Sequence, residues 1–368
     1  MNKPKLWITI VLAIVVLALI GWNLSDSDNA APVAVNDQDP TYQSQHTVTV
    51  VYNPLGALNY KLVSDEVKYY TTTQLTWFTN PVMTMYDKDK IPVWTVRSDR
   101  AKMTDDKMLY LYGHVQVDSL TPDTSQLQRI RTDNASVNLV TQDVASDDEV
   151  TLYGTGFTSN GMKMRGNLRN KTAELIDKVN TSYEIQTKNR IRNLLITSSL
   201  LAVSIPAFAL KDDTTKPITI DSANQALDVN TNTATFTGNV VVNQGSIQVK
   251  ADKVVVIRPN GVSGQEVVEG YGNPVTFYQM QDNGKPISGH ALKVRYEVAN
   301  DLVTLTGNAY LEQQDSNVKG DKITYLVQKQ QMQAFSDNKG GRVTTVLVPS
   351  QLQDKGQQPA TTPTKKSK

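Results

Sequence analysis

The side chains that most often carry enzyme chemistry are few in this sequence and far apart. The three histidines, His46, His114 and His290, lack paired ligand spacing, and a metal site needs several such ligands together. No cysteine occurs, which excludes disulfides, thiolate nucleophiles and thiolate metal sites. We therefore expect each histidine on a polar strand face or at a strand corner, and we expect no metal and no cofactor.

Two acidic stretches could in principle bind a cation or act as acid and base. The stretch Asp87-Lys88-Asp89-Lys90 lacks the glycine and glutamate that must follow in a calcium loop. The triplet Asp147-Asp148-Glu149 reads as a solvated loop and not as a pair of catalytic carboxylates. The chain also has no nucleophile elbow and no phosphate loop. The sequence therefore predicts a protein that is not an enzyme.

Length and charge bound the remaining possibilities. The chain has 368 residues, enough for two domains that each bury a core. Its 37 Lys and Arg balance 36 Asp and Glu, so no overall field favours nucleic acid.

The N-terminal segment has the features of a membrane anchor. Residues Leu6 to Trp22 are almost all apolar and are about long enough to cross a bilayer. Lysines precede the segment and aspartates follow it, so the N-terminus is expected in the cytoplasm and the rest of the chain outside. A cleaved signal peptide is the alternative. We expect an anchor over residues 1–22 and a linker over residues 23–44.

A second targeting signal lies inside the chain. Lys188, Arg190 and Arg192 precede a short apolar run that ends in Pro206-Ala207-Phe208-Ala209, the order of parts in a signal peptide. A second anchor and a core helix are the alternatives. Residues 187–209 therefore indicate that two exported proteins have been joined, and cleavage after Ala209 would separate them. The polar tail over residues 351–368 is expected to be disordered.

Both halves repeat an apolar alternation that is centred on a glycine. Gly113, Gly238 and Gly307 each have apolar residues two and four positions away on both sides, and shorter copies surround Gly154 and Gly272. Such alternation predicts β-strands with one buried face, and a glycine on that face allows a bend. Gly238, Gly272 and Gly307 are 34 and 35 residues apart, which indicates a repeated pair of strands.

Asp99, Asp133, Asp252 and Asp321 mark places where the alternation changes phase. A change of phase predicts a bulge or corner, at which we expect the aspartate to bond to backbone. Asn167, Asn224 and His290 occupy similar places. The turn pairs Asn260-Gly261 and Asn283-Gly284 favour hairpins. The predicted fold is therefore all-β, with two folded-over antiparallel β jelly-roll domains over residues 45–186 and 210–350, and a parallel β-helix is the alternative.

Several longer segments resemble known families of the lipopolysaccharide transport (Lpt) system. Residues 1 to about 186 resemble the LptC family of inner-membrane tethers, and residues 188 to about 356 resemble the LptA family of periplasmic bridge proteins. The first resemblance depends on residues 39–42, 51–54, 87–92 and 108–114, and the last run ends in His114. The second depends on residues 236–240, 251–256 and 272–279.

This resemblance implies a fold and a set of partners. Members of these families are folded β jelly rolls that stack end to end by strand addition, so that their apolar troughs form one path for lipopolysaccharide toward the outer membrane. The implied partners are lipopolysaccharide, an inner-membrane ABC transporter, an outer-membrane translocon and further copies of the bridge domain, with no nucleic acid. A structural or adhesive β-repeat protein with a closed core, and a carbohydrate-active β-helix enzyme, are the alternatives.

The resemblance also implies roles for individual residues. Those expected to line the lipid path are Thr47, Phe78, Thr214, Ile218, Phe277 and Val298, although alternation alone fits a closed core equally well. Ala173 and Tyr183 are expected at the edge that meets the second domain near Ile218. Gly56 and Gly154 resemble important positions of the tether, and a turn or bend explains them as well.

Overall fold

The computed structural model describes residues 39–54, 56–121, 127–184, 213–262, 264–314, 316–329, 331–336 and 342–346. The expected anchor, most of its linker, the internal signal segment and the C-terminal tail lie outside these residues. Within the described ranges, no helix is both long and apolar enough to cross a membrane.

The described residues are almost entirely β-structure. They form 22 strands and three short 3-10 helices. The strands of the first half are β1 Tyr42–Tyr52, β2 Leu58–Tyr70, β3 Leu75–Thr79, β4 Val82–Tyr86, β5 Pro92–Arg97, β6 Arg100–Met103, β7 Met108–Ser119, β8 Leu127–Asn138, β9 Asp143–Ser146, β10 Val150–Gly154, β11 Phe157–Gly161, β12 Lys163–Asn167 and β13 Thr172–Tyr183. Those of the second half are β14 Ile218–Asp228, β15 Thr233–Gln244, β16 Ile247–Ile257, β17 Val267–Met280, β18 Pro286–Glu297, β19 Leu302–Gln313, β20 Ser316–Leu326, β21 Gln331–Phe335 and β22 Thr344–Val346. The helices are η1 Asp213–Thr215, η2 Pro259–Gly261 and η3 Val298–Asn300.

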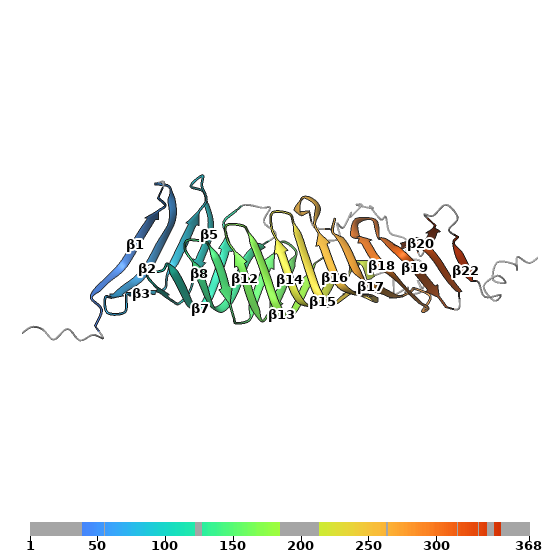
Figure 1. The fold of residues 1–368 in the computed structure, drawn as a ribbon, viewed down its shortest axis with the longest axis horizontal. Coiled ribbons are helices and arrows are strands. Elements are labelled where there is room, and N and C mark those ends of the chain that lie inside the picture. The colour runs from blue at the N-terminus through green and yellow to red at the C-terminus, as the bar shows by residue number, and fades with distance from the viewer. Residues whose placement is uncertain are drawn as a thin grey trace, which may run out of the picture.

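All strands belong to one antiparallel sheet. They follow one another along the long axis of an elongated molecule, from β1 at one end to β22 at the other (Figure 1). The segments with Asn260-Gly261 and Asn283-Gly284 connect β16 to β17 and β17 to β18, and both pairs of strands are antiparallel. The hairpins predicted from these turns are therefore confirmed, and the parallel β-helix is excluded for the described residues.

Corners interrupt most of the long strands near their middle. On β7, β15 and β19 the corner consists of two consecutive residues with positive φ, namely Gly113-His114, Gly238-Asn239 and Gly307-Asn308. Each register shift leaves one residue of the next strand opposite them, and these residues are Asp133, Asp252 and Asp321. Two residues opposite one is a β-bulge, which bends the strand and changes its side-chain phase. The predicted corners at these aspartates are confirmed.

Three expectations about the corners were wrong. His290 stays in the regular ladder opposite Tyr310, and the register shift of β18 falls at Leu292. Asn167 lies at the end of β12 and holds the following turn, where its side chain accepts a hydrogen bond from the Asn170 N–H at 2.8 Å. The bend of that region is instead at Met162, between β11 and β12. The Asp99 carboxylate bonds to a side chain and not to backbone, because its Oδ2 lies 2.7 Å from Nδ1 of His114.

The corners divide the sheet into two layers. Layer A contains β4, β5, β10, β11, β22 and the parts of the longer strands that continue them, such as residues 218–222 of β14. Layer B contains β3, β6, β9, β12, β21 and the remaining parts, such as residues 224–228 of β14. Phe277 of layer A lies edge-on to Tyr325 of layer B, with ring centroids 6.2 Å apart. The sheet is therefore folded over, and the inner faces of its two layers contact each other.

Candidate functional site

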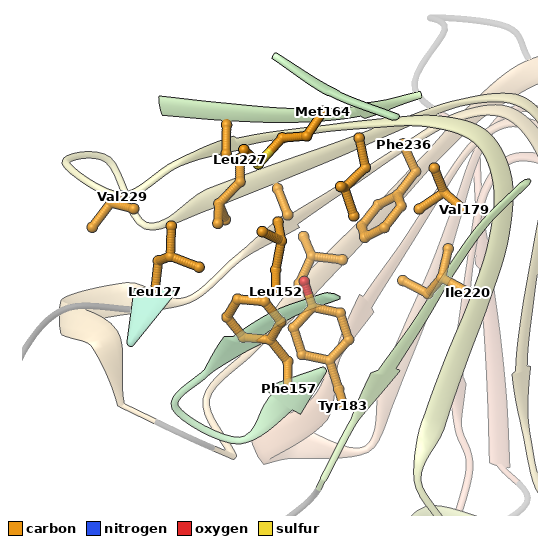
Figure 2. Close-up of a cluster of buried hydrophobic side chains, with 14 of the residues drawn as sticks. Leu127, Leu152, Phe157, Met164, Val179, Tyr183, Ile220, Leu227, Val229 and Phe236 are labelled. Atoms are coloured by element: carbon orange, nitrogen blue, oxygen red, sulfur yellow. The ribbon is translucent and has the colours of Figure 1, made fainter. Parts of the chain in front are cut away.

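The space between the two layers is the candidate functional site. Its buried apolar side chains form one cluster that extends from Tyr60 in the first half to Val327 in the second. Figure 2 shows part of this interior, where Met164 and Leu227 from layer B and Leu152, Phe157 and Tyr183 from layer A converge. The two halves therefore share a continuous apolar interior.

The structure places most of the residues predicted to line the lipid path inside this interior. Phe78, Ile218, Phe277 and Val298 have relative exposures of 4%, 3%, 2% and 8%. Thr47 is half-buried on β1, and its hydroxyl has no hydrogen-bond partner. Thr214 belongs to η1, next to the start of β14. These residues lie at intervals along the molecule and do not form one compact pocket.

An apolar cavity lies between the two layers in the second half. The cavity has a volume of about 30 Å³, and it is lined by Ile218, Val242, Gln244, Ile247 and Val249 of layer A and by Val254, Val268, Gly270, Val294 and Tyr296 of layer B. This cavity is much smaller than an acyl chain of ordinary length, so at this place the layers would have to move apart as such a chain enters.

The pairing of β13 with β14 joins the two halves. Tyr183 lies opposite Ile218 in the register of these strands, and Ala173 lies opposite Leu227. All four side chains are buried. Since β13 and β14 exchange main-chain hydrogen bonds as any neighbouring strands do, the sheet passes from one half to the other without an edge.

This pairing makes a prediction that can be tested with cysteines. Directly opposed residues of antiparallel strands have Cβ atoms about 4.5–5.5 Å apart, close to the spacing that a disulfide needs. Because the chain has no cysteine, a variant with Tyr183→Cys and Ile218→Cys can form only the one intramolecular disulfide. We expect it to form on mild oxidation, which thiol titration measures. After cutting at a protease site inserted behind Ala209, the halves should stay together on a non-reducing gel.

The matched control combines Tyr183→Cys with Asp228→Cys, at the opposite end of β14. These two cysteines are too far apart to join, so the cut halves should separate with and without reductant. Separation of the Tyr183→Cys, Ile218→Cys pair under oxidising conditions would contradict the register.

A buried ion pair lies at the junction of the two halves. The side chains of Arg258 and Glu266 are 2% and 4% exposed. Arg258 Nε donates to Glu266 Oε1 at 3.0 Å, whereas Nη2 lies 2.9 Å from the same oxygen without hydrogen-bond alignment. Arg258 follows the layer B end of β16, yet its Nη1 donates to the carbonyl oxygen of Thr155, which follows β10 in layer A. The pair thus connects the rims of the two layers.

Tyr183 completes this contact between the halves. The Arg258 guanidinium lies over its ring, 5.7 Å from the centroid, and the ring also packs against Phe157. Burial raises the pKa of Tyr183, so the phenol is uncharged at neutral pH. The last strand of the first half therefore contacts a cation from the second half.

Sequence reasoning missed a polar cluster inside the apolar interior. Thr181 Oγ1 lies 2.9 Å from Ser159 Oγ and 3.1 Å from Gln225 Oε1. All three residues are at most 1% exposed, and Gln225 Nε2 has no partner. The signal was present in the sequence, because Thr181 and Gln225 stand in phase with apolar neighbours on β13 and β14. Such polar residues point inward.

The singled-out glycines and histidines have structural roles in the fold. Gly56 has φ +76° in the turn after β1, and Gly154 ends β10 beside a register shift. His114 pairs with Asp99 at a corner; that hydrogen bond raises the pKa of His114. His290 stacks on Tyr310 with ring centroids 4.9 Å apart.

Comparison with known proteins assigns each half to a family. A family model described as "Lipopolysaccharide-assembly, LptC-related" matches residues 10–184, and one described as "LptA/(LptD N-terminal domain) LPS transport protein" matches residues 219–331. The lipopolysaccharide export system protein LptC of Escherichia coli K12 is 61% identical over 188 residues, which are 51% of this chain and 98% of that protein. LptA of the same strain is 64% identical over 180 residues, which are 48% of this chain and 97% of that protein.

One solved structure is also similar. It is LptH, described as the LptA homologous periplasmic component of the conserved lipopolysaccharide transport device from Pseudomonas aeruginosa. The match has 26% sequence identity and a TM-score of 0.35, and covers 38% of this chain and 99% of that one.

Proposed function

Because the first half of this chain belongs to the LptC family and the second half to the LptA family, we propose that the chain is a lipopolysaccharide export bridge. It receives the glycolipid at the inner membrane and passes it across the periplasm toward the outer membrane. The observation that carries this proposal is the apolar interior that continues through both halves across the β13–β14 pairing. A bridge made of separate closed domains would lack this continuity.

The physical task of such a bridge is to keep acyl chains out of water. Each methylene group that leaves water contributes about 0.8 kcal/mol, so a lipid with several chains cannot cross the periplasm unaided. The two layers offer apolar inner faces, and we take their folded arrangement to be the β jelly roll of these families. Since the chain has no nucleotide motif, we propose that the upstream ATPase implied by the resemblance to the Lpt families drives the movement.

We propose that Thr47, Phe78, Thr214, Ile218, Phe277 and Val298 contact the moving lipid. Four of these side chains are buried between the layers, and Ile218 lines the cavity. Ala173, Tyr183 and Ile218 hold the two domains, over residues 45–186 and 210–350, in register. Residues 1–22 anchor the chain in the inner membrane, and residues 187–209 are a remnant of an export signal. Mass spectrometry of the mature protein would show whether the bond after Ala209 is cut.

The two ends of the sheet offer edges for further partners. Within the described residues β1 pairs only with β2, and its exposed residues include Val48, Val50 and Tyr52. An unpaired strand edge with apolar side chains is suited to strand addition. We propose that β1 docks on the inner-membrane transporter, and that the β21 and β22 end docks on a further bridge domain or on the outer-membrane translocon.

Photocrosslinking in living cells tests the lipid path. Phe277 and Tyr278 are neighbours on β17 that face opposite ways, since Phe277 is 2% exposed and Tyr278 is 39% exposed. A photoreactive amino acid at Phe277 should capture lipopolysaccharide, and the same group at Tyr278 should capture at least several-fold less. Immunoblotting of the irradiated protein for lipopolysaccharide measures the difference.

Phe78 provides an independent position in the first half, where it is 4% exposed. Capture there as well would place lipid in both halves. If neither Phe78 nor Phe277 captured glycolipid, the interior would be a closed core and the structural or adhesive alternative would replace the transport proposal.

A further inference from the structure

A cleft of about 460 Å³ in the first half is lined by segments of both layers. From layer A these are the segments that join β1 to β2 and β4 to β5, and from layer B those that join β8 to β9 and β12 to β13. The volume is within the range of pockets that hold small ligands. None of the residues proposed to contact the moving lipid lines this cleft, so its chemistry is considered separately.

Hydrogen bonds hold the walls of the cleft in place. Trp94 Nε1 donates to the carbonyl oxygen of Leu168 at 2.9 Å, which ties β5 of layer A to the turn after β12 in layer B. The Leu168 N–H donates to the carbonyl oxygen of Gln142 at 2.9 Å. On the other side, Asn53 Oδ1 accepts a hydrogen bond from the Ala57 N–H at 2.9 Å. The cleft is therefore formed without a ligand.

Part of the lining is apolar and joins the interior between the layers. Leu168 is 4% exposed and belongs to the buried cluster, and Val93 packs against that cluster. Leu58 also lines the cleft and is half-buried. A ligand in the cleft therefore contacts the same apolar interior that the proposed lipid path uses.

Cations prevail among the charged residues of the cleft. Lys88, Arg169 and Lys171 line it together with one carboxylate, that of Asp87. This carboxylate is held in its own turn, where Oδ1 accepts two main-chain N–H groups at 2.9 Å. Arg169 Nη2 donates to the carbonyl oxygen of Val140 at 2.9 Å. The ammonium groups of Lys88 and Lys171, by contrast, form no ion pair or hydrogen bond with any described residue.

We propose that this cleft binds a phosphate monoester, with Lys88 from layer A and Lys171 from layer B as its cationic partners. Phosphate oxygens form strong charge-assisted hydrogen bonds, and lysine binds phosphate as a point charge. The apolar part of the lining favours a phosphate that an amphiphile carries. The inference rests on the proposed lipid transport and adds recognition of a phosphorylated head group to it.

The charge of the two lysines favours a phosphate monoester over a carboxylate. A phosphate monoester carries a charge of about −1.5 to −2 at neutral pH, so it can offset both ammonium groups, whereas a carboxylate offsets one. Lys88 is exposed and Lys171 is half-buried. Ion pairs at such positions are weak and are screened by salt, which suits a site that must release its ligand.

Binding of two matched glycolipids to the purified full chain tests the proposal. The probes are a diacylated glucosamine with and without a phosphate group on the sugar, and displacement of a fluorescent copy of the phosphorylated probe measures the affinities. We expect the wild type to bind the phosphorylated probe roughly three- to tenfold more tightly at low ionic strength. High salt should bring this ratio close to one.

A double variant and a matched control make the outcome specific. Lys88→Gln combined with Lys171→Gln should weaken binding of the phosphorylated probe until the ratio is about one. The control combines Lys61→Gln with Lys163→Gln, which removes the same charge from exposed positions outside the cleft. It should keep the ratio of the wild type. Arg169 is left unchanged, because its guanidinium also holds a turn.

Inorganic phosphate distinguishes the two possible sources of the ligand. If it displaces the probe at a concentration similar to that of the phosphorylated glycolipid, the cleft is a site for free phosphate. If it does not, the ligand is the phosphate of a lipid head group. A short polyglutamate peptide that displaced the probe equally well would make the cleft a carboxylate site and overturn the proposal.

The remaining failures are distinct from a failure of transport. Equal binding of the two glycolipids to the wild type, or an unchanged ratio in the double variant, would overturn the phosphate site. Photocapture of lipopolysaccharide at Phe78 and Phe277 does not depend on these lysines, so it would still decide the transport proposal.

Discussion

Replacement of Arg258 by alanine is expected to lower the free energy of unfolding by about 3–5 kcal/mol, because it leaves the buried carboxylate of Glu266 without its partner. The side chains of this pair are only 2% and 4% exposed, so water cannot take the place of the guanidinium. The variant also loses the hydrogen bond to Thr155 and the contact with the Tyr183 ring. Urea unfolding followed by circular dichroism measures the change.

Two other variants distinguish the destabilisation by an unpaired buried charge from the contribution of the ion pair itself to the free energy of unfolding. Arg258→Met combined with Glu266→Leu removes both charges, and it should recover most of the lost stability because an apolar pair can replace a buried ion pair. Arg295→Ala is the control, since the Arg295 side chain is 39% exposed, and surface ion pairs contribute at most about 1 kcal/mol. An Arg258→Ala variant no less stable than Arg295→Ala would show that the buried pair is unimportant.

The Arg258–Glu266 pair also joins the two halves of the chain. Arg258 belongs to the second half, whereas Thr155 and Tyr183 belong to the first. Loss of Arg258 should therefore increase hydrogen exchange at the end of β13 and in the turn after β10 more than at distant strands such as β19. This pattern would identify the pair as a contact that holds the two halves together.

The repeating parts of the fold were predictable because they depend on local sequence. Alternation on β7, β15 and β19 indicates which face is buried, and the phase changes at Asp133, Asp252 and Asp321 locate the corners. The corner of β13 was missed, because Asp177-Lys178 adopts the same pair of positive φ values without a glycine. A left-handed conformation of two such residues is set by the surrounding sheet and not by their own preference.

The polar features of the interior were harder to predict. A polar residue in an alternating strand is read as outward-facing, so Gln225, Gln244 and Thr181 were not recognised as buried. Their burial follows from strand phase, which is visible only when the whole strand is considered. The contact between Arg258 and Thr155 joins positions 103 residues apart, and no local pattern contains such information. The apolar site was therefore predictable in outline, whereas its polar groups required the structure.

The corner of β15 leads to the last prediction, which concerns Gly238. This residue has φ +84°, and a Cβ atom built on it would lie 2.6 Å from the Cβ atom of Ala223 on β14. Gly238→Ala should therefore lower the free energy of unfolding in two ways. The left-handed backbone costs about 1–2 kcal/mol, and the close contact with Ala223 costs about 1–3 kcal/mol. Gly284, with φ +74° and nothing within 4 Å of such a Cβ atom, is the matched control.

Gly284→Ala should lower the free energy of unfolding only by the penalty for a left-handed backbone, about 1–2 kcal/mol. The difference between the two variants in urea unfolding thus isolates the close approach of β14 and β15 at the corner, where the sheet folds over just beyond the junction of the halves. Equal losses would mean that the neighbouring strand yields to an added methyl group. In that event the folded layers would be less tightly held than the geometry of Gly238 and Ala223 implies, and opening of the interior for an acyl chain would need correspondingly less free energy.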